Sequence, residues 1–331
     1  IRIAVKHSAE GGVVFLDAIK PFVPMRPTHY YMAMAEQIPN FPRHTKRSYI
    51  GTYEENGIHL NRPVFPLPER ITDEQIQAFQ SIEEKYLALC DEIDAPPLSN
   101  SNLAEQEALE LYESYHFAYI DGYITGKHIP NGDATYIKAM RAIARRCKRD
   151  RREEDIQRYI DMLLHVRDQH MSINWYHGRG FATSILFMRE ILKERGLMDV
   201  ALDYLKETYR FPRIYDVTSC NGVAGKRFED TDVIGMDLPS LLVCVLLMEN
   251  SPEKVRDMYH FIDYVEHTCL SYAPGLASGY KPDGTAFHHC GYITQYATVS
   301  NYSLARVIYM LSDSVFQISP EALARFRKTL E

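Results

Sequence analysis

The sequence predicts a mainly α-helical fold, built as a layered or toroidal array of antiparallel helical hairpins and preceded by strands of a β-domain. Two observations lead to this prediction. From Thr72 to about residue 311, apolar residues recur at spacings of three and four, in segments separated by short loops. Before them, residues 1–25 alternate between apolar and polar in strand fashion. Consecutive helices joined by short connections pack as antiparallel hairpins, so we expect a helical array.

The first 70 residues are predicted to hold a β-hairpin and a connector. The segments IRIAVKH and VVFLDAIKPFV flank Gly11-Gly12, which suits a hairpin turn. Because an isolated two-stranded hairpin is marginal in water, residues 1–25 are expected to be the last strands of a β-domain whose earlier part precedes them. Residues 26–70 are rich in proline and lack periodicity, which indicates a long connector.

The first helix is predicted to begin at Thr72. Thr72 and Gln75 have the spacing of a capping box, and the apolar positions that follow are Ile76, Phe79, Ile82, Tyr86, Leu89 and Ile93. Similar patterns predict helices near residues 103–121, 134–147, 153–169, 180–195, 198–209, 237–249, 252–270 and 299–311. No regular period points to a TPR or HEAT repeat.

Composition excludes several classes of protein. The chain of 331 residues suffices for one large domain or two, and its 46% hydrophobic content excludes a mainly disordered protein. With 37 Lys and Arg against 44 Asp and Glu, the net charge of −7 lacks the basic excess of a non-specific nucleic-acid binder. The longest apolar run, Leu238 to Met248, is shorter than the ~20 residues that span a membrane. Neither nucleic acid nor membrane is therefore an expected partner.

The cysteines are widely scattered. They are Cys90, Cys147, Cys220, Cys244, Cys269 and Cys290, with no CxxC pair among them. In a chain far larger than the small disulfide-stapled scaffolds, this pattern predicts mostly free thiols.

Basic residues crowd the end of one predicted helix and the start of the next. They are Arg141, Arg145, Arg146, Lys148, Arg149, Arg151 and Arg152. One interpretation is a solvated helix end, where cations interact favourably with the helix dipole. The other is a local basic surface that binds a polyanion.

Residues 229–232, in the sequence FEDTD, gather carboxylates of the kind that a glycosidase pair or a calcium site needs. The segment lacks a Gly-centred loop with regularly spaced oxygen ligands. A polar loop is therefore the favoured interpretation.

A dense polar and aromatic cluster precedes the helix predicted near residue 180. It consists of Asn174, Trp175, Tyr176, His177 and Arg179, and it contains the only Trp of the chain. A lone Trp usually belongs to the core. Its neighbours here are residue types that hydrogen-bond hydroxyls and carboxylates, so a sugar ring stacked on Trp175 is the rival interpretation.

The stretch GYKPDGTAFHHCGYITQY, residues 279–296, contains the largest number of candidate catalytic side chains. Its PDG sequence at 282–284 predicts a tight turn. The candidates that follow are His288, His289, Tyr292 and Tyr296. On a regular helix, His289 and Tyr296 would lie about 10 Å apart, so joint action requires a non-helical loop, which Gly291 permits. Because the stretch lacks the i, i+4 His pair of a zinc site, it is either a catalytic loop or a hydrogen-bonded structural one.

These motifs resemble the polysaccharide lyases of the chondroitin and hyaluronate lyase family, most closely its broad-specificity chondroitin sulfate ABC branch. GGVVFLDAI resembles the last strands of that branch's N-terminal jelly-roll domain, and SILFMREILKERGLMDVALDYLKETYRF resembles one of its helical hairpins. The stretch 279–296, running into SNYSLARVIYMLSDSVFQIS, is similar to its catalytic segment. The resemblance implies a jelly-roll end at 1–25, a connector at 26–70, and a catalytic (α/α) toroid at 71–331, incomplete because it stops before the family's later catalytic Arg and Glu.

By this resemblance, His289 and Tyr296 take the places of the family's catalytic His and Tyr. Asn174 takes the place of an Asn that helps to neutralise the uronate carboxylate. The expected substrate-binding residues are Trp175, Tyr176, His177, Arg179, His288 and Tyr292. The implied reaction is β-elimination, in which a base removes the C5 proton of a uronate and an acid serves the departing C4 oxygen.

The resemblance also implies a bacterial, secreted or periplasmic monomer that acts on chondroitin or dermatan sulfate, and on hyaluronan as a further candidate. It implies no required cofactor or catalytic metal, and a structural calcium ion stays open. Two alternatives remain. One is a non-catalytic helical carbohydrate-binding protein, and the other is an α/α-toroid glycosidase that uses carboxylates such as Asp230 and Asp232.

Overall fold

The computed structural model describes residues 65–94, 103–120, 122–130, 134–168, 178, 180–215, 228–289 and 291–331. Within these ranges the chain is mainly helical, which confirms the predicted class. The predicted hairpin at 1–25 and almost all of the predicted connector lie outside the described residues.

The helices and strands have the following bounds. The helices are α3 (Asp73–Asp94), α4 (Glu105–Ser114), α5 (Ala134–Asp150), α6 (Glu153–Asp168), α7 (Phe181–Glu194), α8 (Met198–Thr208), α9 (Thr231–Met236), α10 (Leu238–Leu246), α11 (Pro252–Tyr264), α12 (Thr294–Leu311) and α13 (Pro320–Lys328). The strands are β1 (Ala118–Ile120), β2 (Tyr123–Thr125), β3 (Gly279–Tyr280), β4 (Ala286–His288) and β5 (Gly291–Tyr292).

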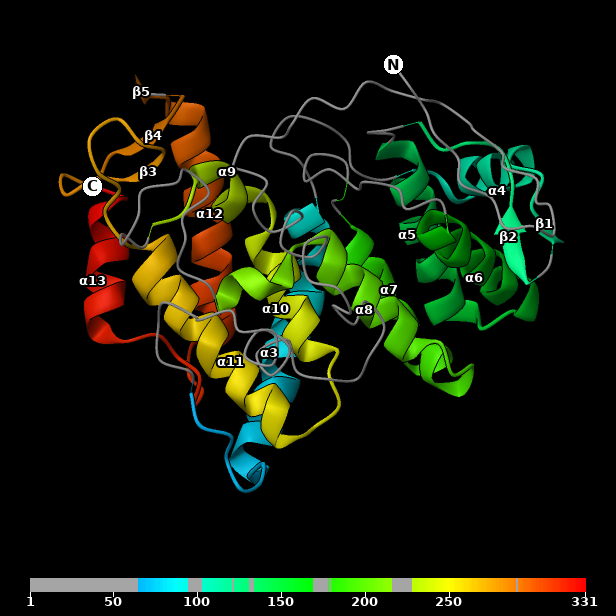
Figure 1. Cartoon of the computed structure of the whole chain (residues 1–331), viewed down its shortest axis with the longest axis horizontal. Helices are drawn as coiled ribbons and strands as arrows, with labels where there is room; N and C mark the ends of the chain where they lie inside the picture. Colours follow the sequence, from blue (N-terminus) through cyan, green and yellow to red (C-terminus); the bar gives the residue numbers. More distant parts are fainter. Residues whose placement is uncertain are drawn as a thin grey trace, which may run out of the picture.

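The helices form two groups that meet at α10 (Figure 1). One group holds α4 to α8 with the β1–β2 hairpin, and the other holds α3, α9 and α11 to α13 with β3 to β5. Helix α10 contacts α7 and α8 on one side and α11 and α12 on the other, and all nine of its residues are buried. The long apolar run of the sequence is therefore the central core helix, since a helix that is apolar on all sides is buried. No described helix has the length and apolar character to cross a membrane.

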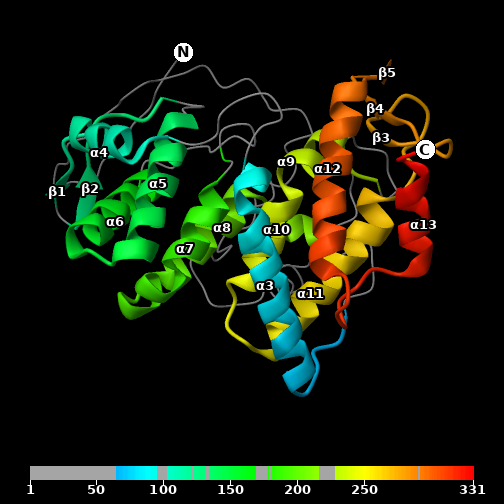
Figure 2. The ribbon, with the colours of Figure 1, turned by 180° about the vertical axis from the view of Figure 1, so that it is seen from behind.

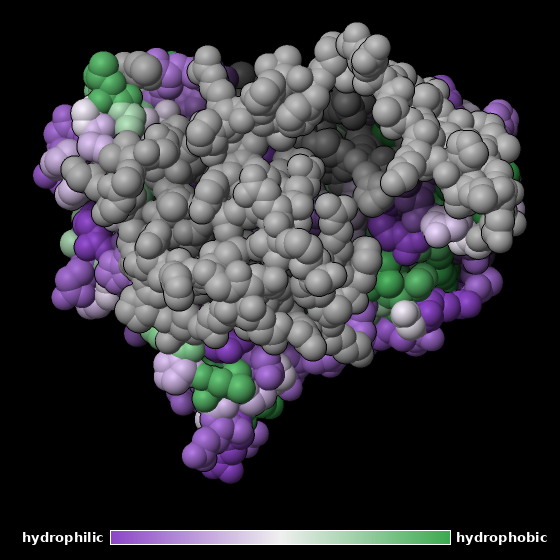
Figure 3. All heavy atoms as spheres, in the orientation of Figure 1, coloured by the Kyte–Doolittle hydropathy of each residue, from purple (hydrophilic) through white to green (hydrophobic). Residues whose placement is uncertain are grey.

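Consecutive helices pack on one another, as expected for helical hairpins. Contacts join α4 to α5, α5 to α6, α7 to α8 and α10 to α11. Contacts between helices distant in the sequence complete the core, because α5 also packs on α7 and α3 lies beside α12 (Figure 2). On the face shown in Figure 3, the surface formed by the described residues is mainly hydrophilic, with small separate hydrophobic patches.

The helix predicted to begin at Thr72 has the expected cap. The Thr72 amide donates to Gln75 Oε1 at 3.0 Å, and the Gln75 amide donates to Thr72 Oγ1 at 3.2 Å. These two bonds satisfy amides that the first turn leaves without a helical partner. The capping box is confirmed.

The helix predicted at 103–121 ends early, at Ser114, and the β1–β2 hairpin follows. His116 and Gly122 have positive φ, which a continuing helix excludes. The hairpin is held by packing instead, because Ile124 is buried and the Tyr119 hydroxyl donates to Asp161 Oδ1 at 2.7 Å. Tertiary contacts here override a local helical pattern.

The helix predicted at 299–311 begins earlier, at Thr294, and α9 and α13 were not predicted. For α13 a signal existed. Ser319 accepts a hydrogen bond from the Ala322 amide, and Pro320 occupies the first helical position.

The described cysteines are free, as predicted. Cys90, Cys147, Cys244 and Cys269 are buried and form no disulfide. Burial raises the pKa of both Cys147 and Cys244 to about 12, so these two thiols stay protonated and unreactive at neutral pH.

Candidate active site

The candidate site is a strand–turn–helix unit formed by residues 279–311. Strands β3, β4 and β5 pair antiparallel in that order, with His288 opposite Gly291. The turn between β3 and β4 is closed by the Lys281 amide, which donates to Thr285 O, and by the Gly284 amide, which donates to Lys281 O. The turn predicted at 282–284 is thus confirmed. Helix α12 begins at Thr294, directly after β5, so the hairpin delivers its residues to the N-terminus of that helix.

Three aromatic rings meet at this junction. His289 lies in the two-residue loop between β4 and β5, with a φ of +49°. Such tight hairpins favour positive φ. Successive side chains of a strand point to opposite faces, but the chain turns at His289, and its ring centroid lies 4.0 Å from that of His288. Tyr296, in the first turn of α12, has its ring centroid 4.0 Å from that of His288 and 5.7 Å from that of His289. The non-helical loop therefore brings His289 and Tyr296 together.

His288 is the buried member of the three, with only 5% of its surface exposed. Its Nδ1 lies 3.1 Å from Asp230 Oδ1 and 3.3 Å from Thr231 Oγ1. Its Nε2 lies 3.4 Å from Asp232 Oδ2, but this approach is not aligned as a hydrogen bond. The ring thus faces a carboxylate at each nitrogen.

His288 and its two neighbouring carboxylates form the group of described residues whose donor atoms could hold a metal ion. Asp230, Asp232 and His288 each offer one atom, and these atoms lie within 4.8 Å of one another. Carboxylate oxygens and an imidazole nitrogen suit a divalent cation. The imidazole can give only one of its two nitrogens to an ion, which leaves the other to its carboxylate.

The carboxylates are positioned by the start of α9. Asp230 caps this helix, since its Oδ1 accepts a hydrogen bond from the Asp232 amide at 2.8 Å. Glu229 Oε1 accepts from the Asp230 amide at 2.9 Å, and Glu229 Oε2 accepts from the Tyr264 hydroxyl at 2.6 Å. Burial, reinforced by the Glu229 carboxylate, holds the pKa of Tyr264 well above its usual value, so this hydroxyl remains a donor.

The favoured interpretation of residues 229–232 as a polar loop is only partly right, because Glu229 and Asp230 lie outside the helices and strands whereas Thr231 and Asp232 begin α9. Glu229, Thr231 and Asp232 are buried, because α9 packs closely against α12. A Cβ atom at Gly235 would lie 2.7 Å from Val299 Cγ1, so glycine permits this approach. The sequence signal that could have found the helix start is Asp230 before Thr231 and Asp232, a common N-cap pattern.

The other expected site residues divide into two sets. Tyr292 lies on β5 and is 54% exposed, beside the His289 loop. The cluster that contains the only Trp lies outside the described residues, and its members are Asn174, Trp175, Tyr176, His177 and Arg179. Their placement relative to His289 and Tyr296 stays a prediction.

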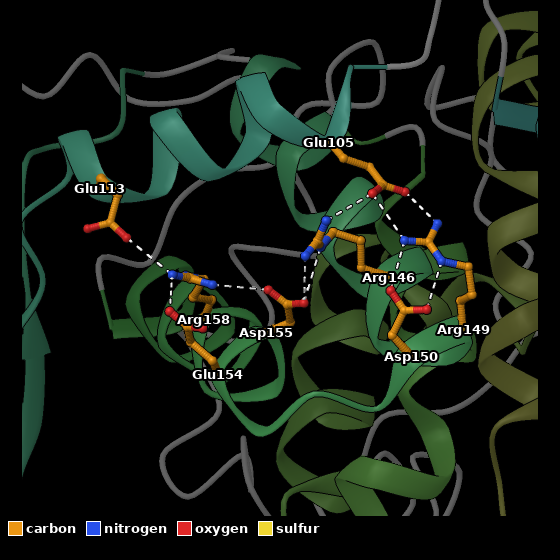
Figure 4. Close-up of polar contacts among 8 residues, drawn as sticks. All are labelled: Glu105, Glu113, Arg146, Arg149, Asp150, Glu154, Asp155 and Arg158. Atoms are coloured by element: carbon orange, nitrogen blue, oxygen red, sulfur yellow. Dashed lines mark hydrogen bonds and ion pairs between the residues drawn. The ribbon is translucent and has the colours of Figure 1, made fainter.

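The basic cluster at the end of α5 is extensively ion-paired (Figure 4). Arg146 lies between Glu105 and Asp155, at 3.0 and 3.1 Å, and Arg149 pairs with Glu105 and Asp150. Further pairs join Arg141 to Asp91 and Asp94, Arg145 to Asp91, and Arg151 to Glu194. Because these carboxylates offset the arginine charges, a structural role at the helix end is favoured over a polyanion-binding surface.

Comparison with known proteins gives one family match and several relatives. Residues 131–330 match the family described as "Lyase, catalytic". The chain is 23% identical over 324 residues to a chondroitin sulfate ABC exolyase of Bacteroides thetaiotaomicron, covering 86% of this chain and 30% of that protein. It is 29% identical over 101 residues to a chondroitin sulfate ABC exolyase of Proteus vulgaris, covering 30% and 10%. It is 24% identical over 184 residues to a chondroitin sulfate ABC endolyase of Proteus vulgaris, covering 53% and 18%. The chain thus spans less than a third of the length of each relative.

Proposed function

Because the chain belongs to the lyase catalytic-domain family, we propose that it is part of a polysaccharide lyase that cleaves chondroitin and dermatan sulfate by β-elimination. The resemblance to chondroitin lyases that the motifs indicated is confirmed. The observation that carries the proposal is the meeting of the His289 and Tyr296 rings at the first turn of α12, inside the region of the family match.

In the proposed reaction, Tyr296 as phenolate removes the C5 proton of a uronate. The electron pair forms the C4–C5 double bond, the bond between C4 and its glycosidic oxygen breaks, and that oxygen takes a proton from Tyr296. His289 assists this transfer, or serves as the base for the iduronate epimer. The uronate carboxylate is already negative, so the developing charge must be offset, and Asn174 is the proposed donor. The first turn of α12 adds the partial positive charge of a helix N-terminus, which favours a bound anion.

Substrate binding is assigned to the cluster at residues 174–179 and to Tyr292. Trp175 and Tyr176 are proposed to stack on sugar rings, and His177, Arg179 and Tyr292 to hydrogen-bond hydroxyl, sulfate or carboxylate groups. The partner is then an anionic polysaccharide, chondroitin or dermatan sulfate, with hyaluronan as a further candidate.

The finer features of the fold and the cellular setting are proposals of the same kind. They comprise an (α/α) toroid within residues 71–331, jelly-roll strands at 1–25, a connector at 26–70, and a secreted or periplasmic monomer in a bacterium. They derive from the resemblance and from the bacterial sources of the relatives.

The scheme assigns no step to a cofactor. A cation held by Asp230, Asp232 and His288 would have a structural role beside the reacting pair. Treatment of the intact protein with EDTA is expected to leave the rate of elimination unchanged. A lowered melting temperature that calcium restores would reveal a structural ion, and a lost rate that calcium restores would contradict the scheme.

The decisive test of the reaction uses the intact protein with chondroitin sulfate, dermatan sulfate and hyaluronan in turn. Elimination produces a conjugated, unsaturated uronate that absorbs in the ultraviolet, so the absorbance is expected to rise. Absence of any rise on all three polymers would refute the proposal.

The role of Tyr296 is tested by Tyr296→Phe, which removes only the hydroxyl. We expect turnover to vanish while the dissociation constant for a chondroitin oligosaccharide changes less than threefold. Tyr309→Phe, an exposed position on the same helix, is the matched control and is expected to keep full activity. An active Tyr296→Phe enzyme would remove this hydroxyl from the acid–base role.

The two alternatives give different products. A non-catalytic carbohydrate-binding protein would bind the polymer without forming product. A glycosidase would release reducing ends without the ultraviolet signal, but its candidate carboxylates Asp230 and Asp232 face His288 here, and Asp232 is buried.

A further inference from the structure

One buried titratable group beside the reacting pair has no task in the proposed reaction. His288 contacts the rings of both His289 and Tyr296, yet its own surface is almost fully covered. A side chain buried to this extent is poorly placed to bind sugar directly, although the sequence suggested that use.

We propose that His288 is a positioning residue. Asp230 and Asp232 fix the orientation of its ring, and that ring packs against the rings of His289 and Tyr296 and fixes their orientation in turn. The proposal rests on the proposed function, because it concerns the geometry of the same reacting pair. It assigns the α9 carboxylates a task that reaches the reaction only through His288.

The contacts form a continuous path from the core to the reacting pair. Tyr264 on α11 bonds Glu229, and Glu229 bonds the amide of Asp230. Asp230 and Asp232 then face the two nitrogens of His288. Two carboxylates that approach different nitrogens of one ring limit its rotation. The His288 ring lies against Tyr296 at an interplanar angle of 34°.

The path joins two elements that must be held in register. Asp230 and Asp232 belong to α9, whereas Tyr296 belongs to α12, and the two helices pack closely. His289 lies in the loop between β4 and β5, with a left-handed backbone. The His288 ring contacts both residues, so it can hold their relative orientation at 88°.

A purely space-filling role does not explain the carboxylates. An aromatic hydrocarbon ring of similar size would fill the volume, but it would offer no nitrogen to Asp230 or Asp232. The presence of a carboxylate near each ring nitrogen indicates that the orientation of the ring is selected.

The test uses Asp230→Asn and Asp232→Asn in the intact protein. Asn keeps the size of the side chain and remains a good N-cap, so Asp230→Asn removes the charge that faces His288 without removing the start of α9. His288→Gln removes the ring itself. Asp283→Asn is the matched control, because this carboxylate accepts hydrogen bonds from Thr285 in an exposed turn of the same hairpin.

Each Asn variant is expected to lower kcat by about 10- to 100-fold, since a displacement near 1 Å can cost about 100-fold in rate. KM and oligosaccharide affinity should stay within threefold, because Tyr292 and the other proposed binding residues are untouched. Asp283→Asn should leave kcat unchanged. An unchanged kcat in the variants, or losses of kcat and affinity that merely follow a lowered melting temperature, would overturn the proposal.

A second readout does not depend on activity. With 3-fluorotyrosine placed at position 296, the ¹⁹F resonance should shift or broaden in Asp230→Asn, Asp232→Asn and His288→Gln, and not in Asp283→Asn. If the wild-type protein cleaves none of the polymers, the proposed function fails and this resonance alone decides the positioning role. A resonance unmoved by all three variants refutes it. If His288→Gln does not fold, the two Asn variants carry the test.

Discussion

Acid should weaken the α5–α6 part of the fold through one buried histidine, His165. Its Nδ1 lies 3.2 Å from the Tyr136 hydroxyl, and that hydroxyl donates its single proton to Met162 O at 3.0 Å. The hydroxyl therefore accepts from Nδ1, which fixes the tautomer of a neutral ring. Phe117 and Tyr115 pack edge-on against the imidazole. Burial lowers the pKa of His165 to about 4, although Asp168 opposes the shift.

The size of the effect follows from the two pKa values. The unfolded chain binds a proton near pH 6.5, whereas the folded protein binds it only near pH 4. Between these values the unfolded state holds more protons, so stability is complete above pH 6.5 and falls as the pH is lowered. At about 1.4 kcal/mol per pH unit, the free energy of unfolding should drop by about 2 kcal/mol between pH 7 and pH 5.

The measurement is urea unfolding followed by circular dichroism at pH 7 and pH 5. His165→Asn supplies an amide in place of Nδ1 and does not titrate, so its loss of stability between the two pH values should be smaller than that of the wild type by about 2 kcal/mol. His267→Asn, an exposed position, is the control and should behave as the wild type. Equal losses in the wild type and His165→Asn would refute the assignment to His165.

Two further substitutions test individual contacts of the fold. Arg141→Met leaves the buried Asp94 carboxylate without the Nε that lies 2.5 Å from it, so thermal and urea unfolding should show a loss of about 3–5 kcal/mol. Adding Asp94→Asn should recover part of that loss, and an additive or greater loss would contradict the pairing. Gly284→Ala should cost about 1–3 kcal/mol, because Gly284 has a φ of +92° and the new Cβ would lie 2.2 Å from Lys328 O. Hydrogen exchange should then increase in α13, and unchanged exchange there would show that the turn does not support this helix.

Local patterns were sufficient for several of the helices. The capping box at Thr72 depends on two residues three positions apart, and α10 depends on a run of apolar residues, so neither needs knowledge of distant contacts. The turn at 282–284 is equally local. The pairing of His289 with Tyr296 was also open to prediction, because the two residues are only seven positions apart and Gly291 permits a non-helical loop between them.

Other features depended on partners that come from elsewhere in the chain. The arginines of α5 suggest a basic strip until Glu105 and Asp155, from α4 and α6, are placed beside them. The β1–β2 hairpin has the spacing of a helix, and only the burial of Ile124 and the bond from Tyr119 to Asp161 explain its strands.

The sequence by itself determined the helical class, the helix starts with local caps, and the candidate pair His289 and Tyr296. Hydrogen bonds and periodicity within a few residues carry that information. Only the tertiary structure decided that Asp230 and Asp232, 56 to 58 positions before His288, face its two nitrogens. The physical reason is that the close packing of α9 on α12 creates this juxtaposition, and no spacing along the chain encodes it.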